Sequence, residues 1–484
     1  MFDGFDEISP NYKETVLDLL QDLNPLKQPW IEQLWVTTRP HLREELEDNL
    51  QELCYTLEQF SEENQVEFLT KFWHKHSKLQ EGNQQQLETY ARALIEKLAQ
   101  SISDKEKEFT GIPLQTRMLA EAFEKEVKTY CLSQKSEPDL PKKMRLVDLY
   151  RKLVKEKMNI FKSKGEIAEE QLSDILQYDI SFTKNHQKLA LEVLLPEVKD
   201  TVLKIEESDV LAPEAISRIG IVQYVDEKPH FIHRTFLEFY VADFLATRLT
   251  KEAHFVLEVL NILFKILLGA DYEVIRFFLD GLLVNPEKSK VLKQYGEQIY
   301  KIWTLCENKK EKLTRAELGT VLRKAAAEGN AHITDFIFSS LKATGKSDTI
   351  KKLMLRIDSY GETSWHLAAK RGHIKTSETL WFCGREVQVK FKDDVLLSMD
   401  LYRYTAWYIA AYKGNKEILE KLWCWGREVQ VNLKDDLLLS KCFHGRTAWG
   451  IAAETGNKEI LEKLRFWVME VQFNIKYHLL PDKD

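Results

Sequence analysis

An acidic cluster opens the chain, where residues 2–7 read Phe-Asp-Gly-Phe-Asp-Glu and carry carboxylates at Asp3, Asp6 and Glu7. Carboxylate oxygens are hard ligands that suit Mg²⁺, and such a cluster normally ends a buried strand beside the Mg²⁺ of a bound nucleotide. The same three residues would equally suit a solvated amino terminus, because short charged runs are commonly surface features. The sequence therefore offers a nucleotide–metal site, with a surface segment as the alternative.

The phosphate-binding loop that should accompany such a site is not found in the sequence. In P-loop NTPases the motif Gly-x-x-x-x-Gly-Lys-Ser/Thr lies upstream of the acidic strand. The nearest match, Thr344-Gly345-Lys346-Ser347, has Ser340 where the first glycine should be, and both of its neighbouring segments have helical patterns. We interpret it as a chance loop. Without the loop's lysine and hydroxyl, this chain is not expected to hydrolyse ATP.

Composition is that of a globular protein, with 484 residues, 44% hydrophobic residues and a net charge of −7. The length predicts several domains, and the even spread of 69 basic and 76 acidic residues argues against nucleic acid as the main partner. The six cysteines show no C-x-x-C spacing, which favours reduced thiols and a cytoplasmic location. The most apolar stretch, 254–270, contains Glu258 and Lys265, so no membrane span is expected.

The elements that must position these residues are mostly helices. A helical pattern over Val16–Leu23 precedes a short apolar strand at 34–38, which delivers Arg39 at its carboxyl end, where α/β sheets bind ligands. From 42 to 131 the pattern is helical again. A strand–turn–strand pattern over 219–233 then leads into a helix at 235–249, which is typical of a winged-helix domain.

The last third of the chain repeats itself every 42 residues. Thr363-Ser-Trp-His-Leu-Ala-Ala recurs at Thr405 and Thr447, and each copy is followed in register by a glycine at 372, 414 or 456. Fixed-period self-similarity indicates a solenoid, and a worn copy at Ala325-Ala326 brings the expected number of repeats to four. Trp365, Trp407 and Trp449 are expected in the core between repeats.

Each 42-residue unit is longer than the common helical repeat of about 33 residues. The extra residues fall at 386–397 and its copies, where alternating Val387, Val389 and Phe391 predict a strand-like or extended finger. Paired acids at 393–394 and 435–436 would either touch a basic partner or form a solvated turn. Intrahelical ion pairs are expected for Lys416 with Glu420 and for Glu417 with Lys421.

The order of these motifs resembles one family, the NACHT branch of the STAND signalling NTPases, with ankyrin repeats in the sensor position. The resemblance extends over nearly the whole chain. Four motifs carry it: residues 2–7 are similar to the Walker B motif, Val36-Thr-Thr-Arg-Pro40 to sensor 1, Gly111-Ile-Pro-Leu114 to the helical-domain Gly-x-Pro, and 231–239 to the winged-helix histidine motif.

This resemblance implies roles for individual residues. Asp3 would hold Mg²⁺ through water, and Asp6 with Glu7 would orient the attacking water. Arg39 would sense the γ-phosphate, Pro113 would pack on the adenine, and His233 would reach the β-phosphate of ADP. Exchange of ADP for ATP would then release an off state and permit homo-oligomerisation. On the residues alone, Arg39 could be a loop charge, and a histidine such as His233 on an aromatic-rich segment is more often structural.

The predicted fold is mainly α and multidomain, with a partial α/β P-loop NTPase remnant. The expected domains are a nucleotide-domain remnant (1–42), a helical domain (43–135), a winged helix (144–250), a second helical domain (251–312) and ankyrin repeats (313–484).

Without a phosphate loop, the chain is expected to be a fragment of a longer protein or a degenerate paralogue. The implied function is a nucleotide-controlled scaffold, with ATP/ADP and Mg²⁺ in its complete form, that binds a protein partner through ankyrin repeats in innate defence. The alternative is an ankyrin adaptor with a non-catalytic NTPase half.

Overall fold

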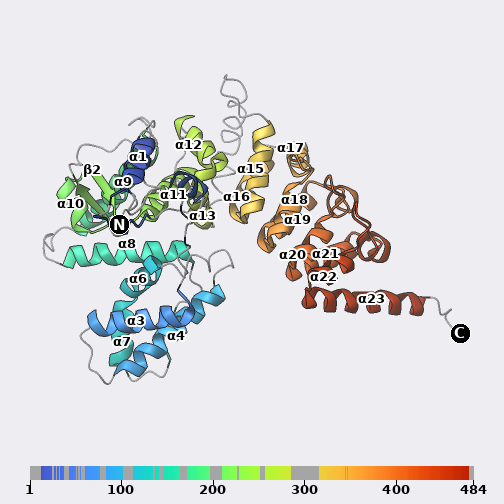
Figure 1. Cartoon of the computed structure of the whole chain (residues 1–484), viewed down its shortest axis with the longest axis horizontal. Helices are drawn as coiled ribbons and strands as arrows, with labels where there is room; N and C mark the ends of the chain where they lie inside the picture. Colours follow the sequence, from blue (N-terminus) through green and yellow to red (C-terminus); the bar gives the residue numbers. More distant parts are fainter. Residues whose placement is uncertain are drawn as a thin grey trace. The chain divides into compact units, whose positions relative to one another are not determined.

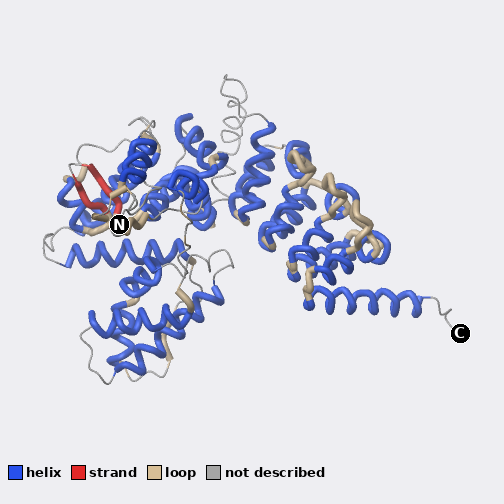
Figure 2. Tube along the Cα trace, in the orientation of Figure 1, coloured by secondary structure: helices blue, strands red, loops and turns tan. Residues whose placement is uncertain are grey.

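The computed structural model is mainly helical, as predicted (Figures 1 and 2). It forms two compact units, residues 1–159 and 160–484. No described helix is long and apolar enough to cross a bilayer. The residues that the structure describes are 12–23, 27–28, 30–31, 33–36, 43–50, 52, 55, 60–76, 83–101, 113–133, 137–140, 145–163, 172–196, 210–225, 228–250, 257–284, 315–343, 345 and 347–478.

Helices make up the regular structure described in the first unit. They are α1 (Lys13–Asp22), α2 (Arg43–Leu50), α3 (Glu62–His76), α4 (Gln84–Ser101), α6 (Pro113–Ala122), α7 (Glu124–Leu132) and the start of α8 (Leu146–Ser163). Ser61 caps α3 by accepting a hydrogen bond from Asn64 N at 3.2 Å. The core centres on Trp73 of α3, whose indole donates to Ala120 O at 2.7 Å and whose ring meets Tyr90 of α4 edge-on.

The strand expected at 34–38 is not a regular strand in its described part. Within residues 33–36, Val36 alone forms an isolated bridge, and Trp35 is exposed. A strand needs a paired neighbour along its length, and the described residues offer none there beyond Val36.

The second unit begins with helices around a β-hairpin. They are α9 (Leu172–Leu194), α10 (Pro213–Arg218) and α11 (Arg234–Thr250), and the hairpin of β1 (Val222–Val225) and β2 (Lys228–Phe231) lies between α10 and α11. The strands are antiparallel, with Val222 opposite Phe231 and Val225 opposite Lys228. The predicted hairpin and the helix after it are confirmed, and Figure 2 shows this hairpin as strand within an otherwise helical trace.

Two further helices join this region to the repeats. They are α12 (Leu257–Leu268) and α13 (Glu273–Leu282), linked by the short 3-10 helix η6 (Ala270–Tyr272), and they contact α15 (Arg315–Glu328) and α16 (Ala331–Ala343). Arg276 of α13, only 2% exposed, binds both carboxylate oxygens of Glu328 at 2.7 and 2.6 Å. Its guanidinium also donates to Ile266 O and Gly269 O at 2.6 Å. Asp280 of α13 accepts from Ile333 N at 2.8 Å and so caps α16.

The repeats stack as two layers of helices (Figure 1). The first layer contains α15, α18 (Ser364–Arg371), α20 (Ala406–Lys413) and α22 (Ala448–Glu454). The second layer contains α16, α19 (Ile374–Glu386), α21 (Lys416–Glu428) and α23 (Lys458–His478). Each helix contacts its counterpart in the next unit for α15–α18–α20–α22 and for α16–α19–α21.

Repeated local signals start and stop these helices. Thr363, Thr405 and Thr447 are the N-caps of the first-layer helices α18, α20 and α22, and each accepts a backbone N–H with its hydroxyl. Gly372 and Gly414 end two of them at φ +75°, a left-handed conformation that favours glycine. Asn415 then reaches back from the next unit and donates to Ala369 O at 2.8 Å.

Tryptophans fill the space between successive repeats in two equivalent trios. Trp365, Trp381 and Trp425 form one, and Trp407, Trp423 and Trp467 form the other, with stacked pairs at 4.9 and 4.8 Å. The predicted core positions of Trp365 and Trp407 are confirmed. The prediction for Trp449 is wrong, since this side chain is 41% exposed. Arg465 stands where the other two repeats have Trp381 and Trp423, so Trp449 lacks one of the two tryptophan contacts that Trp365 and Trp407 make.

The expected extended finger after each second-layer helix is a compact helical turn instead. Residues Phe391–Leu396 (η7) and Leu433–Leu438 (η8) each form a π-helical turn that packs on the next second-layer helix. A glycine in the preceding helix makes room for this turn: a Cβ at Gly384 would lie 2.5 Å from Phe391 Cζ, and one at Gly426 3.2 Å from Leu433 Cδ2.

The third copy of this segment departs from the other two. Val468 stands at the position of Gly384 and Gly426, and α23 continues without a break to His478. The valine side chain would fill the space in which the turn folds back. The first repeat instead carries an α-helix, α17 (Ser347–Met354), which contacts α19 in the same way.

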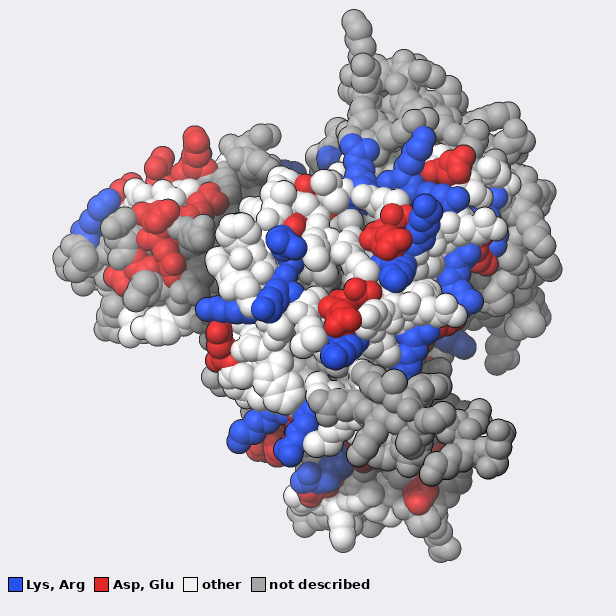
Figure 3. Space-filling model, turned by 90° about the vertical axis from the view of Figure 1, so that its right-hand side faces the viewer, with Lys and Arg blue, Asp and Glu red and all other residues white. Residues whose placement is uncertain are grey.

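Ion pairs connect successive second-layer helices. Lys416 pairs with Glu459 at 2.9 Å, Lys421 with Glu378 at 2.6 Å, and Lys463 with Glu420 at 2.7 Å. The expected i,i+4 pairing is therefore wrong for these residues, because the repeat places the equivalent helix of the next unit alongside. Further pairs are Arg385–Glu428 and Arg427–Glu470. Figure 3, which views the side of the molecule bearing the last repeats, shows acidic and basic side chains adjacent to one another.

Candidate functional site

Most residues predicted to bind nucleotide lie outside the described residues. These are Asp3, Asp6, Glu7 and Arg39. Pro113 is the first residue of α6, and its side chain is also outside the description. Among the predicted nucleotide residues, His233 is the one whose side chain lies within the described part of the chain.

His233 lies between the end of β2 and the start of α11, and it is half-buried. Its Nδ1 accepts a hydrogen bond from Thr235 N at 3.2 Å and lies 2.9 Å from Thr235 Oγ1. Its carbonyl accepts from Phe236 N at 3.1 Å. Because a backbone N–H donates to Nδ1, the neutral ring carries its proton on Nε2. The first residues of α11 thus fix both the orientation and the tautomer of this histidine.

A second histidine, which the sequence analysis missed, is fully buried nearby. His186 of α9 contacts the ring of Phe182 at 3.8 Å and that of Tyr240 of α11 at 5.1 Å. Its Nδ1 lies 3.0 Å from Phe182 O, and its Nε2 has no hydrogen-bond partner among the described residues. Burial lowers the pKa of His186 to about 4, so the ring is neutral at pH 7. It is a core residue with a polar atom left unsatisfied.

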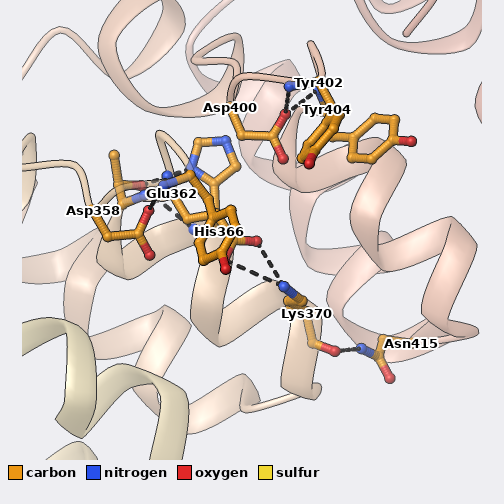
Figure 4. A network of polar contacts seen from close by, with 10 residues as sticks. Asp358, Glu362, His366, Lys370, Asp400, Tyr402, Tyr404 and Asn415 are labelled. Carbon is orange, nitrogen blue, oxygen red and sulfur yellow. Dashed lines mark hydrogen bonds and ion pairs between the residues drawn. The ribbon is translucent and has the colours of Figure 1, made fainter. Parts of the chain in front are cut away.

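A row of turns leads into the first-layer helices of the repeats; we call residues 358–362, 400–404 and 442–446 the tip row. In the first two turns an aspartate holds the backbone (Figure 4). Asp358 Oδ1 accepts from Tyr360 N and Glu362 N at 2.9 and 2.8 Å. Asp400 Oδ1 accepts in the same way from Tyr402 N and Tyr404 N, both at 2.8 Å. Neighbouring turns are also joined, since Leu401 N donates to Tyr360 O at 3.0 Å and Phe443 N to Tyr402 O at 3.1 Å.

A buried network anchors the second turn to the helix of the unit before it. His366 of α18 completes a capping box with Thr363, and its Nε2 lies 3.0 Å from Ser398 O. Burial lowers the pKa of His366, so it remains neutral. Lys370 pairs with the buried Glu362 at 3.0 Å (Figure 4). The His of this repeat motif is thus structural.

Large apolar side chains are exposed along the tip row. Their exposed fractions run from 50% for Tyr402 to 70% for Phe443, with Tyr360 and Leu401 between. Tyr402 stacks on Tyr404, whose ring stacks on Tyr408 at 4.7 Å and 11°. Contiguous exposed apolar groups rimmed by polar residues mark interaction surfaces more often than isolated ones do. The sequence signal was available, because Tyr360 and Tyr402 are one 42-residue period apart.

Two exposed basic residues lie in or next to the tip row, Arg403 in the second turn and Lys441 directly before the third. Of the acidic residues in these turns, Asp358 and Asp400 accept backbone hydrogen bonds, as above. The exposed Arg446 is balanced by Glu454 at 3.0 Å. The surface therefore combines aromatic rings with positive charge, a combination that favours partners carrying acidic and apolar groups.

Comparison with known proteins concerns the first unit. A family model described as the NACHT domain matches residues 1–76, a range that includes α1, α2 and α3. The match extends beyond residue 42, where the sequence analysis ended the nucleotide-domain remnant. No curated protein matches the chain. Residues 1–76 are therefore similar to the NACHT domain, a nucleotide-binding domain of signalling NTPases.

Proposed function

We propose that this protein is a signal-responsive scaffold of the NACHT type that binds a protein partner through an ankyrin-like array. The match of residues 1–76 to the NACHT domain carries the first half of this proposal. The second half is supported by the two-layer stack of threonine-capped helix pairs and by the exposed aromatic tip row. Innate defence, a cytoplasmic location and homo-oligomerisation belong to the same proposal.

ATP or ADP with Mg²⁺ would bind the part of the chain that is similar to the NACHT domain. Asp3 would hold the metal through water, and Asp6 with Glu7 would orient water, while Arg39, Pro113 and His233 would contact the nucleotide. The geometry of His233 suits such a contact, because its Nδ1 is engaged by α11 and its Nε2 carries the proton that a phosphate oxygen could accept. The assignment of 144–250 as a winged helix and of 313–484 as ankyrin repeats belongs to the same proposal.

The nucleotide part is tested by measuring ADP binding to the chain by calorimetry. We expect saturable binding that His233→Ala weakens about tenfold, as for loss of one charge-assisted hydrogen bond. Absence of ADP binding would favour the second candidate function, an adaptor with a non-catalytic NTPase half. That candidate is favoured by the lack of a Gly-x-x-x-x-Gly-Lys-Ser/Thr motif in this sequence.

The partner-binding part is tested by proximity labelling in cells with Tyr402→Ser/Phe443→Ser. Matched controls are Phe382→Ser and Phe466→Ser, which remove exposed aromatic rings from the second layer. We expect the tip variant to lose a set of labelled proteins that the controls retain. Equal labelling in all variants would contradict binding through the tip row.

A further inference from the structure

A cavity of about 240 Å³ opens in the first unit between α4, α7 and the segment that follows α7. Aromatic and acidic side chains line it: Tyr90 of α4, Glu126 and Tyr130 of α7, and Asp139 further along the chain. None of these residues belongs to the proposed nucleotide or partner surfaces. The cavity is slightly smaller than the roughly 300 Å³ lower bound for ordinary ligand pockets, so it suits a short ligand.

Tyr90 gives this cavity an unsatisfied polar group. The side chain is 1% exposed, and its ring is held edge-on by Trp73 at 5.8 Å and against Tyr130 at 5.5 Å. Its hydroxyl has no hydrogen-bond partner in the described part of the chain. Buried hydroxyls are nearly always paired, so an unpaired one in a cavity wall indicates a missing partner.

Two carboxylates lie close enough to act on this hydroxyl. Burial raises the pKa of Tyr90, and the charges of Glu126 and Asp139 raise it further, so both carboxylates act on the hydroxyl. Lys125, which also lines the cavity, pairs with Glu156 of α8 at 2.6 Å. Glu126 of α7 pairs with Lys152, which also belongs to α8. Asp139 is an exposed acid at the cavity's edge, and it too has an interaction partner.

We propose that this cavity binds a small organic cation, an ammonium or guanidinium group on a short carbon chain. The cation would donate to the Tyr90 hydroxyl and lie near the carboxylates of Asp139 and Glu126. Its carbon chain would pack on the rings of Tyr90 and Tyr130. The faces of these rings would also attract the charged group. The source is either a free amine or the lysine or arginine side chain of another protein, since both present the same chemistry.

The test titrates the full chain with butylguanidinium, butylammonium and the neutral isostere butylurea, and measures each Kd by ligand-observed NMR. We expect both cations to saturate one site and butylurea to bind at least tenfold more weakly. Tyr90→Phe and Asp139→Asn should each weaken cation binding about fivefold to tenfold. Comparable binding of butylurea, or no saturable cation binding, would overturn the proposal.

Two controls separate binding from folding. Tyr240→Phe removes another buried hydroxyl that has no described partner, in the second unit, and Glu88→Gln removes an exposed carboxylate from α4. Both should leave the Kd unchanged, and an unchanged Kd in Tyr90→Phe would contradict the assignment. A Gly-Lys-Gly peptide that binds more tightly than butylammonium would identify a protein side chain as the source of the cation. A peptide that does not bind in the cavity would identify a free amine as the source. This titration measures neither ADP binding nor partner binding through the tip row, so its failure would leave the proposed function untouched.

Discussion

His186 is the residue whose protonation most directly concerns stability. The buried ring has a pKa of about 4, whereas an unfolded histidine titrates near 6.5. The unfolded chain therefore binds more protons between these values, and the free energy of unfolding should fall as the pH drops from about 6.5 to 4. The loss should be roughly 3 kcal/mol at pH 4, with full stability above pH 6.5.

Urea unfolding of His186→Phe between pH 4 and 7 checks this prediction. The variant should lose the acid-side decline, because phenylalanine keeps the ring contacts to Phe182 and Tyr240 without a titrating nitrogen. His230→Gln, on the exposed edge of β2, should behave like the wild type. An acid decline that persists unchanged in His186→Phe would assign it to other groups.

At the residue scale, the sequence indicated motif positions better than it indicated burial. Thr363, Thr405 and Thr447 were predictable, because capping depends on a few neighbouring residues. The burial of His186 was not, since it stands among polar residues in α9 and is covered only when α11 packs against it. Likewise, the burial of Trp365 and Trp407 depends on tryptophans of other helices, and Arg465 replaces one of these for Trp449.

Among the elements, the turn η7 offers a sharp test of how glycine sets local structure. Gly384→Ala places a Cβ 2.5 Å from Phe391 Cζ, so the turn must shift although alanine favours the helix. We expect a net loss of about 1–3 kcal/mol in the free energy of unfolding, the usual effect of overpacking. Adding Phe391→Leu, the residue type found at Leu433, should restore part of it, because Met354 Cε would still lie 2.9 Å from the new Cβ.

The matched control is Gly426→Ala in the next unit, where the nearest atom would be 3.2 Å away. Its effect on urea unfolding should be smaller than that of Gly384→Ala. If the two alanine variants are equally stable, or if Phe391→Leu brings no recovery, the close approach of the turn is not what the glycine permits.

Element types were largely predictable and their packing was not. Helices and the hairpin follow from apolar periodicity and turn residues, which are local signals. The segment after α19 was predicted to be extended from its alternating valines, but room beside Gly384 allows a helical turn. Ion pairs such as Lys421–Glu378 join residues 43 apart, and a pattern within one helix cannot reveal them.

At the scale of the whole molecule, the repeats are continuous with the helices before them. The buried pair of Arg276 and Glu328 joins α13 to α15, and the cap that Asp280 provides joins α13 to α16. Removing one partner leaves a buried charge, so Glu328→Gln should lower the free energy of unfolding of the second unit by about 3–5 kcal/mol. Arg276→Met/Glu328→Met should recover part of that loss, because neither charge remains.

Urea unfolding of the full chain measures these variants. Arg385→Met/Glu428→Met, which removes an exposed pair between units, serves as the control and should cost less than about 1 kcal/mol. A similar small effect of Glu328→Gln would show that the joint contributes little. Such a result would leave the repeats and the preceding helices free to unfold separately.

The tip row has a consequence for how this surface can diversify. Its turns are held by the carboxylates of Asp358 and Asp400 and by backbone bonds between neighbours, such as Leu401 N to Tyr360 O. The outward side chains of Tyr360, Leu401, Tyr402 and Phe443 take no part in those bonds. Mutation can therefore exchange the side chains that choose a partner while the scaffold stays intact, so the surface can evolve, or be redesigned, one position at a time.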